Sequence, residues 1–289
     1  MTTKFFLTPW KIESEVLTDQ MPVIDLRSLS LYKQGHLKGA SHFPIGTLVE
    51  RLSELPSRHQ VLCLFGTETQ IIEASHFLIM KNYRVKYQIL ACDSFFQQIS
   101  HRGWLEIGNH SKRLWQPAPV VKRFNKHFSK LTTAKYGLDL ACGAGRDSLY
   151  LAQSGWQMCA IDYSQSALDK LNKLSENLSL PVETQLLNLE KDFSTLIAQE
   201  ARYDLIIVVR YLHRPILEML PLLLKSRGIL VYQTFMQGCE AFGSPKNPRF
   251  LLKAGELAET FNNFNILYDH QELLEDGRPT NAFIAQKHD

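Results

Sequence analysis

The chain has 289 residues, of which 45% are hydrophobic and 21% are charged, and its formal net charge is +3. This length is typical of two domains that each bury a core. No apolar run approaches the roughly 20 residues that span a bilayer, and the first residues lack the features of a signal peptide. We therefore expect a cytoplasmic protein without a membrane segment.

In the N-terminal half, the apolar runs at 22–26 and 60–65 predict short buried strands, and residues 71–81 predict a helix. The segment 109–134 is basic, contains two prolines and has little apolar periodicity, so it is interpreted as a linker. The predicted organisation is a first domain at 1–108, a basic linker at 109–134 and a second domain at 135–289.

Basic residues gather in and near this linker, and their six charges exceed the whole net charge of the chain. They are Lys112, Arg113, Lys122, Arg123, Lys126 and Lys130. The segment is either a solvated connector or a strip that attracts an anionic substrate or RNA.

In the second half, strands are predicted near 136–141, 157–161, 183–187, 205–209 and 229–233. Helices are predicted between them, for example at 147–153, 165–177 and 215–225. Such alternation indicates parallel strands with helices on both faces. The fold class is therefore α/β, with a doubly wound, mostly parallel sheet in the second domain.

The first of these strands runs into the turn Gly143-Ala144-Gly145, at the sheet edge where ligands of such folds bind. Glycine permits the close approach of backbone to ligand, and the following helix offers unpaired N–H groups. Asp162 ends the next strand, where a carboxylate can accept both ribose hydroxyls of an adenosine. Together these positions predict a nucleotide-like cofactor.

Two details favour S-adenosylmethionine (SAM) over NAD. Asp139 precedes the glycine turn, where it can orient water or backbone around a sulfonium-bearing amino acid. The turn continues as Arg146-Asp147, without the third glycine on which a pyrophosphate would sit.

The segment from Leu138 to Asp147, followed by Asp162, resembles motifs I and II of class I SAM-dependent methyltransferases. The resemblance covers about half of the chain and implies a Rossmann-like methyltransferase domain with SAM as cofactor and no metal. It implies cofactor contacts from Asp139, Ala141, Gly143, Gly145, Asp147, Asp162, Tyr163, Asn188, Leu189 and Arg210. The family commonly has aspartate where Asn188 stands, but an amide can still bind the adenine amino group.

Arg146-Asp147, the segment 203–213 and the loop near Gly243 resemble small methyltransferases of the tellurite-resistance type. This resemblance implies a small acceptor, with a sulfur, selenium or tellurium compound favoured. After the fourth strand, Arg210 is expected to hold an anionic acceptor while Tyr211 or His213 orients it; alternatively, His213 only begins a helix.

Other acceptors and the role of the loop at 238–250 stay open. The chain lacks the Asn-Pro-Pro-Tyr or Asp-Pro-Pro-Tyr sequence used to hold a nucleobase amine, which disfavours base methylation by that route. RNA and protein acceptors are not excluded. The loop is either a lid over the active site or a fixed surface loop, and Phe242 and Asn247 are its candidate substrate contacts.

In the first half, residues 23–27 and 35–40 resemble the structural signature of rhodanese domains, over about 23–104. Active members carry a persulfide on the cysteine of a CxxGxR loop. Cys63 is one candidate for that position, but counting back from the predicted helix end places Phe65 there. Glu68 also brings negative charge that should repel thiosulfate and raise the pKa of a thiol. We therefore expect a degenerate rhodanese-like domain.

Two alternatives accompany this interpretation. In one, a Cys63 persulfide makes the first domain an active sulfurtransferase coupled to the methyltransferase domain. In the other, the protein is a SAM-binding adaptor without enzymatic activity. Five cysteines, an odd number without a CxxC pair, predict neither a disulfide framework nor a zinc cluster.

Overall fold

The computed structural model describes residues 5–6, 12–16, 21–132, 134–197 and 201–289. The chain divides into two compact units, Met1–Gln116 and Pro117–Asp289, which we call the N-terminal unit and the C-terminal unit. Among the described residues, no helix has the length and apolar character needed to cross a membrane.

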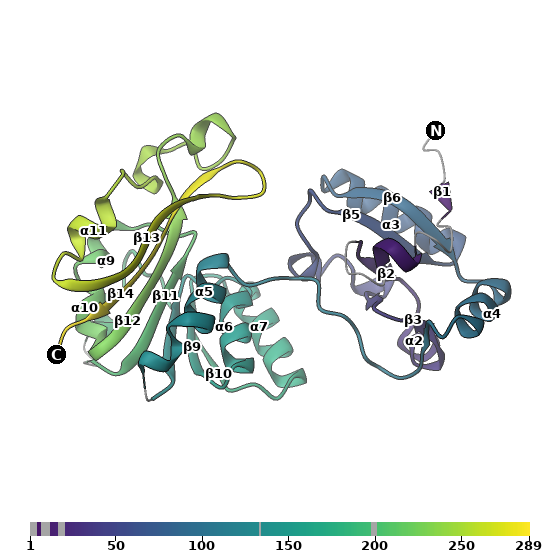
Figure 1. The fold of residues 1–289 in the computed structure, drawn as a ribbon, viewed down its shortest axis with the longest axis horizontal. Coiled ribbons are helices and arrows are strands. Elements are labelled where there is room, and N and C mark those ends of the chain that lie inside the picture. The colour runs from purple at the N-terminus through teal and green to yellow at the C-terminus, as the bar shows by residue number, and fades with distance from the viewer. Residues whose placement is uncertain (1–4, 7–11, 17–20, 133, 198–200) are drawn as a thin grey trace. The chain divides into compact units, whose positions relative to one another are not determined.

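The N-terminal unit contains a parallel five-stranded sheet in the order β1-β6-β5-β2-β4 (Figure 1). Its strands are β1 (Phe5–Phe6), β2 (Val23–Asp25), β4 (Ser41–His42), β5 (Val61–Gly66) and β6 (Arg84–Leu90). A separate antiparallel pair joins β3 (His36–Leu37) to β7 (Leu105–Glu106). The helices are α2 (Leu29–Gln34), α3 (Glu68–Met80) and α4 (Asp93–His101).

The predicted strands and helix of this unit are present. Helix α3 begins three residues earlier than predicted because Thr67 and Gln70 form a capping box at its start. Both faces of the sheet are buried, with alternate residues of β2 and β5 directed to two separate hydrophobic cores.

The C-terminal unit contains a seven-stranded sheet in the order β10-β9-β8-β11-β12-β14-β13. Its strands are β8 (Tyr136–Leu140), β9 (Gln157–Asp162), β10 (Val182–Leu186), β11 (Tyr203–Val209), β12 (Leu224–Phe235), β13 (Phe264–Leu273) and β14 (Pro279–Lys287). The first five are parallel, and β14 is antiparallel to both of its neighbours. The predicted mostly parallel, doubly wound sheet is confirmed. Strand order reverses between β8 and β11, and sheets of this kind bind their ligands at the carboxyl ends of the strands at such a point.

Helices cover both faces of this sheet (Figure 1). Helices α5 (Pro119–His127) and α6 (Arg146–Gln153) pack on one face, and α7 (Gln165–Asn177) packs on β9 and β10. The other face is covered by α8 (Ser194–Ile197), α9 (Arg214–Leu217), α10 (Leu220–Leu223) and α11 (Glu256–Thr260). The predicted helix at 215–225 is instead the two short helices α9 and α10, the second with Pro221 in its first turn, and β12 already begins at Leu224.

The structure also differs from the predicted linker at 109–134. On the N-terminal side, the backbone of residues 110–112 bonds to that unit, with Tyr32 Oη donating to His110 O over 2.8 Å and Lys112 N to Ala40 O over 3.1 Å. On the C-terminal side, Val120, Val121 and Phe124 of α5 are fully buried. These three residues have helical spacing, but the surrounding lysines and arginines obscured it.

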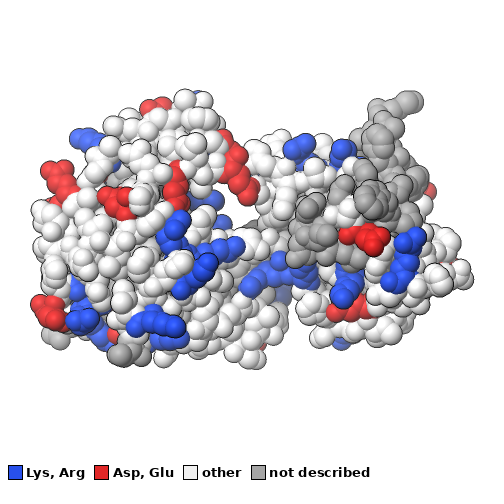
Figure 2. Space-filling view, in the orientation of Figure 1, with Lys and Arg blue, Asp and Glu red and all other residues white. Residues whose placement is uncertain are grey.

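The predicted basic strip is therefore divided between the two units. Lys112 and Arg113 belong to the N-terminal unit, whereas Lys122, Arg123 and Lys126 lie on α5. Figure 2 shows Lys and Arg side chains gathered over the part of the C-terminal unit where Figure 1 places α5. On α5, Lys122 and Lys126 are exposed, whereas Arg123 is half-buried and lies 3.5 Å from Glu272.

Candidate cofactor and acceptor site

The glycine turn connects the end of β8 to the start of α6. Ala141, Gly143 and Gly145 all adopt positive φ angles, of 57°, 56° and 72°. A Cβ on Gly145 would lie 2.2 Å from Leu171 Cδ1, so this position must be glycine for space as well as for conformation. A Cβ on Gly143 would meet no atom within 4 Å. Gly143 therefore leaves open space beside the turn, which fits the close approach of a cofactor.

Asp162, at the end of β9, holds this turn in place. Its Oδ2 accepts a hydrogen bond from Gly143 N over 2.8 Å, and its Oδ1 accepts one from Ser164 N over 2.9 Å. Each carboxylate oxygen keeps a second lone pair, so both can still accept from ribose hydroxyls. The arrangement suits the predicted role of Asp162 in binding adenosine.

Asp139 lies beneath the turn and is only 2% exposed. Its Oδ2 accepts a hydrogen bond from Ser148 Oγ over 2.5 Å. Burial, followed by the negative charge of Asp147, raises the pKa of Asp139 to about 8. A cation bound nearby would favour the ionised carboxylate, so Asp139 can respond to the charge of a bound cofactor.

Asp147 was predicted to contact the cofactor, but its carboxylate already has partners within the protein. Oδ1 accepts a hydrogen bond from Ala118 N over 2.6 Å, and Oδ2 lies 3.3 Å from a guanidinium nitrogen of Arg146. The first bond attaches the residue preceding α5 to the start of α6. Asp147 thus connects two helices beside the glycine turn.

Three further predicted cofactor contacts, Tyr163, Asn188 and Leu189, differ in exposure. The ring of Tyr163 is 76% exposed, so it is free to cover a ligand. Asn188 Oδ1 accepts a hydrogen bond from Glu190 N over 3.0 Å, which shapes the loop after β10. Leu189 is buried and packs into the core beneath this loop, so its side chain is not accessible to a ligand.

The predicted acceptor residues follow β11, which pairs with β8, and so lie at the same edge as the glycine turn. Arg210 adopts a φ of 59°, and its N–H donates to Gln233 O over 2.7 Å. Tyr211 O accepts a hydrogen bond from Tyr232 Oη over 2.8 Å. His213 is half-buried and directly precedes α9, without a side-chain capping bond to that helix.

Burial and the charges of two further arginines affect the pKa of Arg210. The pKa of Arg210 is lowered because surrounding protein removes water from its partly exposed side chain, and the charges of Arg146 and Arg278 lower it further. Asp147 and Asp276 partly offset this effect. Arg146 was predicted only as part of a motif, and Arg278 was not predicted, because the β13–β14 hairpin supplies it without any local signal in the sequence.

The loop after β12 is attached at both ends. Met236 forms a parallel bridge with Leu252, and the Arg214 guanidinium donates to Arg249 O over 2.9 Å and to Leu251 O over 2.8 Å. Asn247 Oδ1 accepts from Arg249 N, which caps a short helical turn. Phe242 is exposed and packs against the backbone at Gly277. Of the two alternatives, these contacts favour a fixed surface loop over a lid.

Cys63 does not stand at the end of a strand, as the sulfurtransferase alternative requires. It lies within β5, fully buried between Val23 of β2 and Tyr87 of β6, and burial raises the pKa of its thiol. A thiol that is neutral and inaccessible cannot attack thiosulfate. Phe65, two residues later, occupies the position near the strand end, so the proposed role of Cys63 as a nucleophile is corrected.

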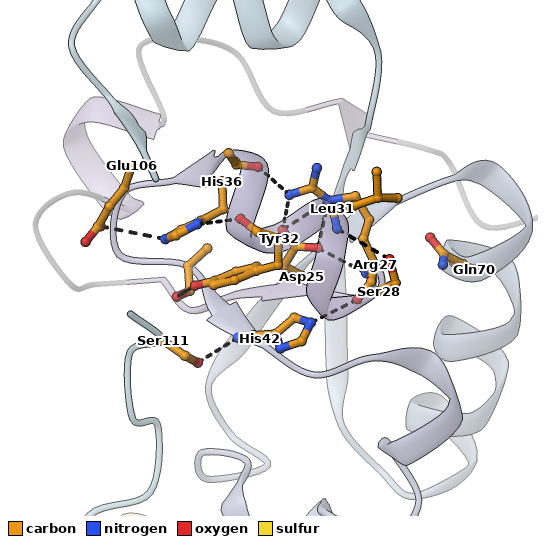
Figure 3. Close-up of polar contacts among 12 residues, drawn as sticks. Asp25, Arg27, Ser28, Leu31, Tyr32, His36, His42, Gln70, Glu106 and Ser111 are labelled. Carbon is orange, nitrogen blue, oxygen red and sulfur yellow. Dashed lines mark hydrogen bonds and ion pairs between the residues drawn. The ribbon is translucent and has the colours of Figure 1, made fainter. Parts of the chain in front are cut away.

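Around the signature residues of the N-terminal unit, the polar groups bond to one another (Figure 3). The guanidinium of Arg27 pairs with Asp25 at 2.6 Å and donates to Gly35 O at 2.9 Å. The ring of Tyr32 stacks on His36, with ring centroids 3.8 Å apart, and His42 Nε2 donates to Arg27 O over 3.0 Å. This network explains the signature as a structural feature.

Comparison with known proteins supports the interpretation of the C-terminal unit. Residues 138–226 match the family model described as a methyltransferase domain. The chain is also 22% identical to an uncharacterized protein of Schizosaccharomyces pombe, a match that covers 96% of this chain and 97% of that protein. This relative therefore matches both units.

Two solved structures are similar to part of the chain. TehB from Haemophilus influenzae matches with a TM-score of 0.46 and 22% identity, over 58% of this chain and 61% of TehB, which is less than two thirds of that protein. A putative S-adenosylmethionine dependent methyltransferase from Listeria monocytogenes matches with a TM-score of 0.48 and 17% identity, over 59% and 98%. The family match at 138–226 confirms the predicted enzyme type and cofactor: the C-terminal unit carries a SAM-dependent methyltransferase domain.

Proposed function

We propose that the C-terminal unit transfers the methyl group of SAM to a small anionic acceptor, with a sulfur, selenium or tellurium compound as the favoured class. The observation that carries this proposal is that three arginines lie at the carboxyl edge of the sheet. Arg210 follows β11, Arg146 begins the helix after the glycine turn, and Arg278 directly precedes β14, which pairs with the end of β12. The charges of Arg146 and Arg278 both act on Arg210. Asp147 and Asp276 offset part of this repulsion, and a bound anion would offset more of it.

The chemistry agrees with this acceptor class. When bound, SAM supplies an electrophilic methyl group, to which a lone pair of the acceptor bonds as the methyl–sulfur bond breaks and its electrons pass to sulfur. The residues of the chain then have two tasks, to align the acceptor with the methyl group and to exclude water. An anionic chalcogen acceptor is already nucleophilic, so no side chain has to remove a proton.

The arginines are suited to alignment. Guanidinium groups bind oxyanions through paired N–H donors in a fixed geometry. Arg278 is itself held by Asp276 at 2.8 Å and by Ser244 O, which accepts its hydrogen bond at 2.7 Å. Arg146 is held by Asp147. The partners of Arg146 and Arg278 limit the side-chain entropy lost when an acceptor binds.

The N-terminal unit is proposed to be a degenerate rhodanese-like domain with a scaffolding or binding role. The proposal is supported by the sequence signature, by the network around Arg27 and by Phe65 near the end of β5. Purified protein should form no thiocyanate from thiosulfate and cyanide, and Cys63→Ala should change only stability. Thiocyanate formation that Cys63→Ala abolishes would restore the sulfurtransferase alternative. Cys92→Ala, at an exposed cysteine of the same unit, is the control.

The methyltransferase proposal is tested by S-adenosylhomocysteine release from the full chain. Candidate acceptors are selenite, tellurite, sulfite, sulfide and a small thiol, with an uncharged alcohol and an amine for comparison. We expect release with at least one anion and none with the uncharged compounds. Turnover of the alcohol or the amine alone would contradict the proposed acceptor class.

Calorimetry separates the enzyme from an adaptor. We expect SAM and S-adenosylhomocysteine to bind and NAD not to bind. SAM binding without release of S-adenosylhomocysteine for any acceptor would instead favour the adaptor, and binding of NAD alone would contradict the assigned cofactor.

A further inference from the structure

Arg210 and Tyr211, the two residues that follow β11, each carry a cost in free energy. Arg210 adopts a φ of 59°, a left-handed conformation that residues other than glycine rarely adopt. The Tyr211 hydroxyl is buried and has no hydrogen-bond partner among the residues that the structure describes. A buried polar group without a partner has lost its hydrogen bonds to water and forms none within the protein, which lowers the stability of the fold. Two adjacent unfavourable features at one strand end indicate a functional constraint.

The backbone here is fixed by its neighbour β12. Gln233 O accepts from Arg210 N at 2.7 Å, and Tyr232 Oη donates to Tyr211 O at 2.8 Å. These two bonds hold the strained conformation and set the direction of the Tyr211 side chain. The unpaired hydroxyl therefore belongs to a well-fixed residue and not to a loose loop.

The strand order indicates which ligand this hydroxyl would meet. Asp162 and Asn188 follow β9 and β10, on one side of β8, and are the predicted contacts of the adenosine. Tyr211 follows β11, on the other side of β8 and next to Arg210. It therefore belongs to the half of the site where the proposed function places the acceptor.

The protonation state of Tyr211 suits a donor. Burial, and then the negative charge of Glu190, raise the pKa of Tyr211 to about 12. The phenol thus stays protonated at any pH at which the protein works. A neutral O–H donor in the residue that follows Arg210 complements an oxyanion.

We propose that the Tyr211 hydroxyl donates a hydrogen bond to an oxygen of the methyl acceptor, which makes Tyr211 an acceptor-binding residue. This inference rests on the proposed function, since it names the contact that an anionic acceptor makes beside Arg210. Other buried side-chain atoms also lack a partner among the described residues, but none belongs to a residue that follows a strand at the site. They are His36 Nε2, Ser75 Oγ, Arg123 Nε and Trp156 Nε1.

The first test needs no ligand. Replacing Tyr211→Phe removes the unpaired hydroxyl and keeps the ring, so the Tm of the full chain should rise by about 2–4 °C. The matched control is Tyr203→Phe at the opposite end of β11, where the hydroxyl bonds to Cys159. Its removal should leave the Tm unchanged or lower it. An unchanged or lower Tm for Tyr211→Phe would overturn the inference, because the hydroxyl would then already be satisfied.

The second test is kinetic. Tyr211→Phe should lower kcat/KM for the acceptor about 10- to 100-fold, since a hydrogen bond to a charged group is lost. The SAM affinity measured by calorimetry should stay within about twofold of the wild type, because a twofold change corresponds to less free energy than the loss of one hydrogen bond. Tyr203→Phe should retain wild-type kinetics. A loss of SAM affinity in Tyr211→Phe would assign the hydroxyl to the cofactor and overturn the inference.

The two proposals fail in different ways. If the wild type releases no S-adenosylhomocysteine with any anion, the proposed function fails and this inference fails with it. If the wild type is active and Tyr211→Phe is equally active, only this inference fails.

Discussion

The carboxylate of Asp162 accepts a hydrogen bond from the backbone N–H of Gly143 over 2.8 Å. The end of β9 thereby holds the turn that follows β8, and the two sequence features that predicted a SAM site are one physical unit. Asp162 has a structural partner and still offers lone pairs to a ribose. Replacing it should therefore affect the turn and the cofactor together.

We expect Asp162→Ala to lower SAM affinity about 100-fold or more, because two hydrogen bonds from ribose hydroxyls to a charged group are lost. Calorimetric titration with SAM measures the effect. Asp169→Ala is the matched control, since Asp169 is exposed on α7, where its Oδ1 accepts a hydrogen bond from Gln165 over 2.8 Å. Equal SAM affinity in Asp162→Ala and Asp169→Ala would contradict the assignment of Asp162.

SAM binding should depend on pH through Asp139. Its pKa is raised to about 8, mainly by burial, so the carboxyl is largely protonated at neutral pH. The cationic groups of SAM favour the ionised form, so affinity should rise as the pH approaches and passes 8, and binding at pH 7 should release a proton. Calorimetry in buffers of different ionisation enthalpy measures that proton. Asp139→Asn should abolish the release, and an unchanged release would exclude Asp139 as its source.

Asp139 should also make the stability of the protein without ligand depend on pH. The pKa of Asp139 is higher in the folded state than in the unfolded state. The contribution of Asp139 to the free energy of unfolding is therefore fully present below pH 4 and is lost as the pH rises toward 8. Urea unfolding of the wild type between pH 5 and 9 should show this decline. In Asp139→Asn the decline in the free energy of unfolding should be smaller, because residue 139 no longer titrates.

Gly145→Ala should destabilise the C-terminal unit by about 2–5 kcal/mol, from the left-handed φ and from overpacking. The added Cβ would lie 2.2 Å from Cδ1 and 2.7 Å from Cγ of Leu171, a fully buried residue. Gly155→Ala is the matched control, because its φ is 87° but the nearest atom to an added Cβ is 3.7 Å away. Only the conformational cost of about 1–2 kcal/mol should remain there. Equal losses in denaturant unfolding would show that the contact with Leu171 is unimportant.

Arg278 should bind the acceptor and not the cofactor. Arg278→Gln should raise the acceptor KM about 10-fold with SAM affinity unchanged, and Arg278→Lys, which keeps the charge, should recover part of the loss. The KM of the wild type should also rise with ionic strength. Arg227→Gln is the control, since Arg227 is exposed and lies 3.7 Å from Asp289. Equal KM values for Arg278→Gln and Arg227→Gln would remove Arg278 from the site.

Much of the C-terminal unit was predictable from the sequence because its determinants are local. A strand, a glycine turn and a helix follow one another at 136–153, and the conformations that the turn requires select glycine at positions 143 and 145. Alternating strands and helices imply parallel pairing, which in turn places the end of each strand at one edge. Asp162 could therefore be assigned to the site before any contact was known.

Other features depended on packing. Apolar residues at helical spacing make α5 part of the core, although basic charge, two prolines and little apolar periodicity over 109–134 indicated a linker. The antiparallel hairpin of β13 and β14 brings Arg278 close enough to Arg210 for their charges to interact, across 68 positions of sequence. No local sequence pattern indicates that two residues so far apart in the chain lie close together in the fold.

The sequence by itself determined the domain type of the second half and its cofactor, and it predicted the strand ends that would hold the cofactor, because these follow from backbone conformation and hydrophobic alternation. Only the tertiary structure decided that Cys63 is enclosed within β5, that Asp147 holds the start of α5 and that the Tyr211 hydroxyl has no partner among the described residues. The reason is physical: burial, pKa and hydrogen-bond satisfaction depend on neighbours that folding brings together from distant parts of the chain.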